Sequence, residues 1–130
     1  MNETEMKERT KQFALRILNL ADHLPKTRKG DILAPQIMRS GTSVAANYRA
    51  LCRAKSRPDF INKTSIVEEE ADETALWLEL IGEDGLISSG RVQPLLQEAN
   101  ELTGIMVASR KTARERGKTI ENRKLKIENS

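Results

Sequence analysis

The chain has 130 residues, of which 32% are charged, and a formal net charge of +3, so its length suits a single, mildly basic domain. Its lone cysteine, Cys52, excludes an internal disulfide and favours a reducing cytoplasmic location. No apolar run approaches the about 20 residues that cross a membrane, and the first residues lack the apolar segment of a signal peptide, so we expect no membrane association.

The first half of the chain has two segments in which apolar residues recur every three or four positions, the spacing of an α-helix. The first stripe consists of Phe13, Ile17, Leu20 and Leu24. Pro25 then ends the first helix. The second stripe consists of Ile37, Gly41, Val44, Tyr48 and Leu51. Because proline is tolerated in a first helical turn, Pro35 predicts that the second helix begins between positions 33 and 35.

Two further stripes occupy the second half of the chain. The third consists of Phe60, Thr64, Val67, Ala71, Thr74, Leu78 and Ile81. Ser56 and Asp59 resemble a capping box before it, and Gly82 or Gly85 provides its stop. The fourth consists of Val92, Leu95, Ala99, Leu102, Met106, Ser109 and Ala113, with Pro94 in its first turn.

Periodicity is lost after Arg116, where the chain becomes polar and basic. We therefore expect a bundle domain over residues 1–116 and a frayed or disordered basic tail over residues 117–130. No segment shows the alternating pattern of a β-strand. Four helical stripes joined by short loops predict an all-α, antiparallel up-down-up-down four-helix bundle.

Charge is strongly segregated along the chain. Residues 49–63 carry five cations and one acid, residues 64–90 carry eight acids and no Lys or Arg, and residues 110–126 carry eight cations and two acids. Arg49, Arg53 and Arg57 are spaced by four, which places them along one helix edge that continues into the next turn. A row of arginines of this kind suits the phosphates of RNA or DNA. A solvated polar face is the plain alternative.

The candidate nucleic-acid-binding residues come from these two basic segments, and the rest of the basic tail over residues 110–126 is expected to help them. They are Arg49, Arg53, Lys55, Arg57, Lys63, Arg110, Lys111 and Arg114. Base-stacking aromatic residues are nearly absent, so sequence-specific reading of single strands is not expected. The acidic segment offers another possibility, since it could pair with the basic edge of a neighbouring molecule and make that edge structural.

The third helix carries a second apolar stripe formed by Ile66, Trp77 and Leu80. One stripe per helix is enough for an isolated bundle. A wide core face would explain the second stripe. A subunit interface centred on Trp77 would also explain it, because aromatic residues are enriched in interface cores.

Catalytic and metal-binding chemistry lack the residues they need. A di-iron site in a helix bundle uses histidines as well as carboxylates, and this chain has one histidine, His23. Ser40, Thr42, Ser43 and Cys52 could act as nucleophiles only if His23 folded against them as a base. We therefore expect no catalytic residue, no metal and no cofactor.

The stretch "RSGTSVAANYRALCRAKSRPDFINKTSIVEEEADETALWLELI", residues 39–81, resembles a bacterial family. Its members are four-helix-bundle proteins first noticed as reading frames inside intervening sequences of 23S ribosomal RNA genes. The matching elements are Arg-Ser-Gly-Thr-Ser-Val, Ala-Asn-Tyr-Arg, Arg-Ala-Lys-Ser-Arg-x-Asp-Phe-Ile and Glu-Ala-Asp-Glu-Thr with Trp-Leu-Glu-Leu. The segment "VEEEADET" is more acidic than the family pattern, which typically has a lysine near Glu69.

The family is similar in fold to the accessory variability determinant of diversity-generating retroelements, a basic pentameric barrel that assists a reverse transcriptase. The resemblance implies a homopentameric ring, nucleic-acid binding and no enzymatic activity. It also implies a polar network between the second and third helices, to which Arg49 could contribute. The other residues of this network are Arg39, Asn47, Asp59, Glu70, Asp72 and Glu73.

Two functional hypotheses follow. In the first, the chain is a non-enzymatic, homo-oligomeric adaptor that binds RNA or DNA, most readily RNA associated with the ribosome. In the second, it is a protein–protein scaffold or an accessory subunit of a reverse transcriptase or another nucleic-acid enzyme, and its basic edge docks on an acidic protein surface.

Overall fold

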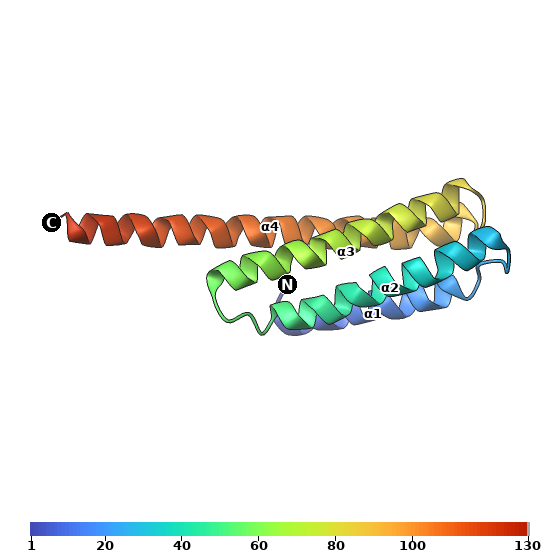
Figure 1. The fold of residues 1–130 in the computed structure, drawn as a ribbon, viewed down its shortest axis with the longest axis horizontal. Coiled ribbons are helices and arrows are strands. Elements are labelled where there is room, and N and C mark those ends of the chain that lie inside the picture. The colour runs from blue at the N-terminus through green and yellow to red at the C-terminus, as the bar shows by residue number, and fades with distance from the viewer. Residues whose placement is uncertain (130) are drawn as a thin grey trace.

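Four α-helices packed against one another make up the fold. The computed structural model describes residues 1–129, and these residues contain no β-strand. The helices are α1 (Glu3–Ala21), α2 (Arg28–Leu51), α3 (Arg57–Glu83) and α4 (Ser89–Glu128). Helix α3 packs against both α2 and α4, whereas α1 packs mainly against α2 (Figure 1). Within residues 1–129, no helix combines the length and apolar character needed to cross a membrane.

The predicted stripes form the core. In α2 all five stripe residues are buried, and in α3 every stripe residue except the half-buried Phe60 is buried. Phe13 and Ile17 of α1 and Leu102 of α4 are also almost completely shielded from solvent. The spacing of three and four residues therefore identified the helix faces that pack together.

Side-chain caps and a glycine define several helix ends. The Thr27 and Ser56 side chains accept hydrogen bonds from the backbone N–H groups of Gly30 and Asp59, at 3.3 and 3.1 Å. The prediction of a cap at Ser56 is confirmed. Gly85 follows α3 with a φ of +75°, a conformation that favours glycine. Gly85, and not Gly82, therefore ends the helix.

Two prolines lie deeper in their helices than predicted. Helix α2 begins at Arg28 and not between positions 33 and 35, and α4 begins at Ser89, so Pro35 and Pro94 fall beyond the first turn. Both prolines are exposed. The carbonyl that loses its N–H partner can then meet water, which reduces the cost of proline inside a helix.

Helix α4 continues past the point where the apolar stripe ends. The sequence prediction ended this helix near Arg116, but the helix runs on to Glu128 and projects beyond the other three (Figure 1). Lys, Arg and Glu, which dominate this segment, are good helix formers, and proline is absent from it. The domain boundary at residue 116 stays a prediction, and Ser130 lies outside the described residues.

Candidate nucleic-acid interface

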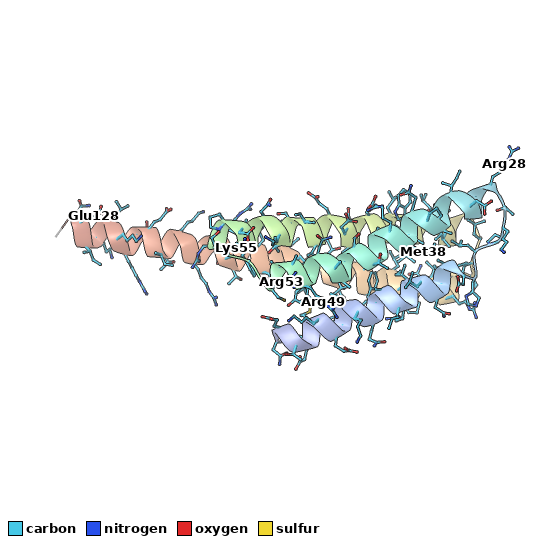
Figure 2. The ribbon with its side chains drawn as sticks, turned by 60° about the horizontal axis from the view of Figure 1, so that its bottom comes forward. Arg28, Met38, Arg49, Arg53, Lys55 and Glu128 are labelled. Carbon is cyan, nitrogen blue, oxygen red and sulfur yellow. The ribbon has the colours of Figure 1, made fainter. Side chains whose placement is uncertain are left out.

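Three exposed cations follow one another at the end of α2. Arg49 lies in the last turn of the helix, and Arg53 and Lys55 lie in the loop toward α3 (Figure 2). Within residues 1–129, none of the three forms a salt bridge. Their charges therefore face solvent and are available to an anionic partner. We call Arg49, Arg53 and Lys55 the basic edge.

Arg57, the third arginine of the predicted series, bonds to another helix of the same chain. Its guanidinium donates a hydrogen bond of 3.1 Å to the backbone carbonyl of Ala113 on α4. A Cβ at Gly117 would lie 3.1 Å from the Arg57 Cδ, so the glycine leaves room for the arginine to lie across α4. Arg57 therefore ties the first turn of α3 to α4.

Two other predicted cations are also paired. The Lys63 ammonium contacts both carboxylate oxygens of Asp59, at 2.6 and 2.7 Å. Arg110 donates to the Glu68 carboxylate, and to the Ser65 hydroxyl at 3.2 Å. The bond to Glu68 raises the pKa of Arg110. Lys63 thus supports the start of α3, and Arg110 holds α4 against α3.

Lys111 and Arg114, the last two predicted cations, are exposed on α4. A hollow of about 390 Å³ is lined by Lys55, Arg57 and Arg116, with Phe60 and Ala113 among its apolar walls. Arg116 lies in the predicted basic tail over residues 110–126, although it is not one of the eight candidate residues. Its signal was present in the sequence, since it lies one turn beyond Ala113, the last stripe residue of α4. The cations of the hollow can bind an anion, and its apolar walls can contact an apolar group next to that anion.

The structure forms only part of the polar network that is predicted between α2 and α3. Arg39 on α2 donates to Glu70 at 3.3 Å and to Glu73, both on α3. Burial raises the pKa of Glu70 even though Arg39 lies beside it. Asn47 instead donates to Ser43 of its own helix, at 2.9 Å.

The remaining network residues lie apart from Arg39. Asp59 serves the start of α3, where its carboxylate also accepts a hydrogen bond of 3.0 Å from the Lys55 backbone N–H. The hydrogen bond from Lys63 lowers the pKa of Asp59. Asp72 is exposed. The structure therefore brings together only Arg39, Glu70 and Glu73 from the predicted set.

The second stripe of α3 is only partly covered. Ile66 and Trp77 are half-buried, and Leu80 is exposed. The Trp77 indole Nε1 is shielded from solvent and has no hydrogen-bond partner within residues 1–129. A buried donor without a partner costs free energy, so a neighbouring acceptor at this position would be stabilising.

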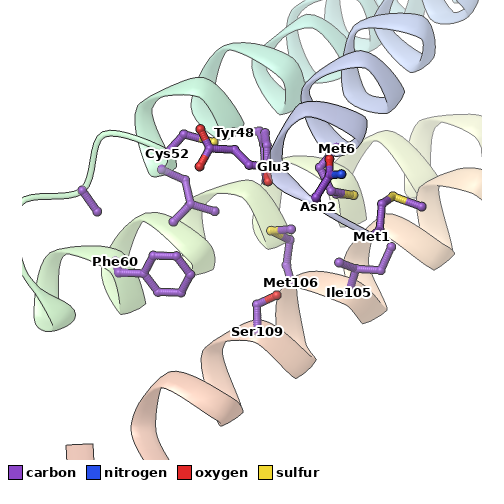
Figure 3. Close-up of a pocket in the computed structure, with 12 residues that line it drawn as sticks. Met1, Asn2, Glu3, Met6, Tyr48, Cys52, Phe60, Ile105, Met106 and Ser109 are labelled. Carbon is purple, nitrogen blue, oxygen red and sulfur yellow. The ribbon is translucent and has the colours of Figure 1, made fainter. Parts of the chain in front are cut away.

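An apolar pocket of about 420 Å³ opens at the N-terminal end of α1. Met6, Met106 and Phe60 line it together with Tyr48 and Cys52 (Figure 3). Burial raises the pKa of the Cys52 thiol and of the Tyr48 hydroxyl. A raised pKa keeps the thiol protonated at neutral pH, so the pocket favours apolar contact over nucleophilic chemistry.

The single histidine lies away from the candidate nucleophiles. His23 is exposed in the loop between α1 and α2, where its Nδ1 is 2.9 Å from the Asn19 carbonyl. Cys52 lies at the opposite end of α2, and the Ser40 hydroxyl is buried, where it accepts a hydrogen bond of 2.8 Å from Thr74. In residues 1–129, no three His, Cys, Asp or Glu side chains are grouped so that they could hold a metal ion.

Comparison with known proteins finds a matching family model and a similar crystal structure. A family model described as 23S rRNA-intervening sequence protein matches residues 2–108. A crystal structure from Bacteroides thetaiotaomicron VPI-5482, described as a protein with unknown function from the S23 ribosomal protein family, is 37% identical. The match covers 81% of this chain and 97% of that chain, with a TM-score of 0.75. No curated protein matches the chain.

Proposed function

Since the chain belongs to the family of 23S rRNA-intervening sequence proteins, we propose that it is a non-enzymatic adaptor that binds nucleic acid, with RNA as its main ligand. The observation that carries this proposal is the basic edge. Arg49, Arg53 and Lys55 are exposed and form no salt bridge within residues 1–129. Exposed cations that form no salt bridge can replace the counterions of a phosphate backbone.

The surroundings of the basic edge support a backbone contact. Lys55 and Arg116 border the same hollow. Lys111 and Arg114 on α4 are also exposed. Arginine and lysine recognise phosphates through charge and hydrogen bonding, without reading bases. The chain offers few aromatic side chains for stacking, 3% of its residues. We therefore expect little sequence preference.

Assembly would strengthen such a weak contact. The antiparallel up-down-up-down order fits the short loops, and we propose that such bundles assemble as a homopentameric ring. Exposed Leu80 and the Trp77 indole, which has no hydrogen-bond partner within residues 1–129, favour a contact between subunits on α3. A ring repeats the basic edge around its axis, and simultaneous contacts raise the overall affinity.

A fluorescence anisotropy assay with labelled RNA at low salt tests the proposal. The wild-type chain should bind duplex and single-stranded RNA of unrelated sequences with similar affinity. Arg53→Ala with Lys55→Ala should weaken binding several-fold. Lys26→Ala with Arg28→Ala removes the same two charge types from the opposite end of α2 and should leave binding unchanged. Absence of binding at low salt would refute the proposal.

A second function is favoured by the apolar walls of the hollow beside Lys55. Phe60 and Ala54 line it together with the cations, a mixture that also suits an acidic protein surface. The chain would then be a scaffold or an accessory subunit of a nucleic-acid enzyme such as a reverse transcriptase. Pull-down from nuclease-treated extract distinguishes the two functions, because a direct protein contact survives removal of nucleic acid.

A further inference from the structure

The projecting part of α4 carries a basic and apolar face that no other helix within residues 1–129 covers. With 100° of rotation per residue, Arg116, Ile120, Arg123, Lys124 and Ile127 fall within about 100° of arc on α4. This arc continues the side of α4 that faces the bundle at Met106 and Ala113. Ile120 is 44% exposed and Ile127 is 76% exposed. We call these five residues the tail face.

Helix α3 carries a face of the opposite charge. Its six residues also fall within about 100° of arc and are all exposed: Glu69, Asp72, Leu76, Glu79, Leu80 and Glu83. Leu76 and Leu80 are 47% and 43% exposed. The salt bridges of α3 within residues 1–129 use other carboxylates, those of Asp59, Glu68, Glu70 and Glu73. We call these six residues the acidic face.

We infer that the tail face of one molecule docks on the acidic face of a second copy of this chain. Three cations and two isoleucines on one side match four carboxylates and two leucines on the other. The lengths also agree, because 11 helical steps on α4 span about 17 Å and 14 steps on α3 span about 21 Å. Apolar residues surrounded by opposite charges are the usual composition of a specific interface.

The contact must form between molecules. Helix α4 is continuous from Ser89 to Glu128, and its projecting part points away from α3 (Figure 1). The tail face therefore cannot reach the acidic face of its own chain. The pairing joins two different surfaces, so it is heterologous, and it closes into a ring or continues as an open chain according to its rotation.

The isoleucines favour a protein partner over the other ligands of a basic helix. A nucleic-acid backbone needs the cations but not two aliphatic residues between them. A helix that lies on a membrane needs a wider apolar face than two isoleucines provide. This inference goes beyond the proposed function, and its assay contains no nucleic acid.

Zero-length cross-linking of carboxylates to amines tests the contact directly. Equal amounts of unlabelled and ¹⁵N-labelled full-length protein, treated with nuclease, are cross-linked at low salt and analysed by mass spectrometry. We expect mixed-isotope links from Lys124 to carboxylates of the acidic face, several-fold more abundant than links from Lys118. Lys118 lies on the opposite side of α4 and is the internal control. Equal yields at both lysines, or no link at Lys124, would overturn the inference.

Charge reversal separates a specific contact from general attraction. Arg116→Glu with Arg123→Glu should reduce the Lys124 links about tenfold or more, since like charges then face each other. Arg28→Glu with Arg91→Glu makes the same change at exposed sites outside the tail face and should leave the links unchanged. Adding Asp72→Arg with Glu79→Arg to the first variant should restore them. Failure of this rescue, or an equal loss in the control, would contradict the docking.

Discussion

At the scale of single residues, Gly41 shows how closely α2 approaches α1. A Cβ at this position would lie 2.6 Å from Cγ2 and 3.0 Å from Cβ of the buried Ile17. Gly41→Ala should therefore lower the free energy of unfolding by about 1–3 kcal/mol through overpacking. Because alanine gains about 1 kcal/mol in helix propensity, the net loss should be smaller, up to about 2 kcal/mol. Urea denaturation measures the change.

Gly104 provides a matched control for this substitution. It lies inside α4, and a Cβ there would have no atom of residues 1–129 within 4 Å. Gly104→Ala should raise the free energy of unfolding by up to about 1 kcal/mol, the difference in helix propensity alone. If both alanine variants were stabilised equally, close packing against Ile17 would not be the reason for a glycine at position 41.

The pair of Arg9 and Glu98 should give stability a pH dependence. Arg9 Nε donates to the Glu98 carboxylate at 2.8 Å, joining α1 to α4, and this bond lowers the pKa of Glu98. A lowered pKa contributes stability above the unfolded value of about 4.3 and loses it as the pH falls through the folded value. Glu98→Gln should therefore cost about 1–3 kcal/mol at neutral pH and much less in acid. Urea denaturation at several pH values would contradict this if the cost were constant.

At the scale of helices, local signals predicted the faces and the caps better than the lengths. The stripes and the Ser56 cap were recognised because they depend on spacing within one segment. The preference of proline for a first turn places the start of α2 too late, because Pro35 lies deeper in the helix and the Thr27 cap begins the helix earlier. The extension of α4 was missed because its two isoleucines, Ile120 and Ile127, are seven residues apart among polar residues and give only a weak periodic signal.

The extension of α4 should be the least protected part of the helix in dilute solution. All side chains of residues 118–129 are exposed, and a helix of this length is marginal in water without packing. Amide hydrogen exchange should be fast there and slow around Val92 and Met106. If the extension docks on a second copy, its exchange should slow as the protein concentration rises. Strong protection of the extension at high dilution would contradict this account.

At the scale of the whole molecule, the sequence predicted where cations gather but not which of them are free. Lys63 could have been set aside, because Asp59 lies four residues before it on the same helix. Arg57 and Arg110 could not, since their partners Ala113 and Glu68 come from another helix. The basic edge that remains is exposed because it lies at the end of α2, outside the packed faces.

The salt dependence of RNA binding tests the central claim most directly. The logarithm of the association constant is plotted against the logarithm of the salt concentration for the wild-type chain and two variants. Arg53→Ala with Lys55→Ala should make this slope shallower by about 1 to 2, because two phosphate contacts are lost. Lys26→Ala with Arg28→Ala should keep the wild-type slope. Equal slopes for all three proteins would contradict a phosphate contact at the basic edge.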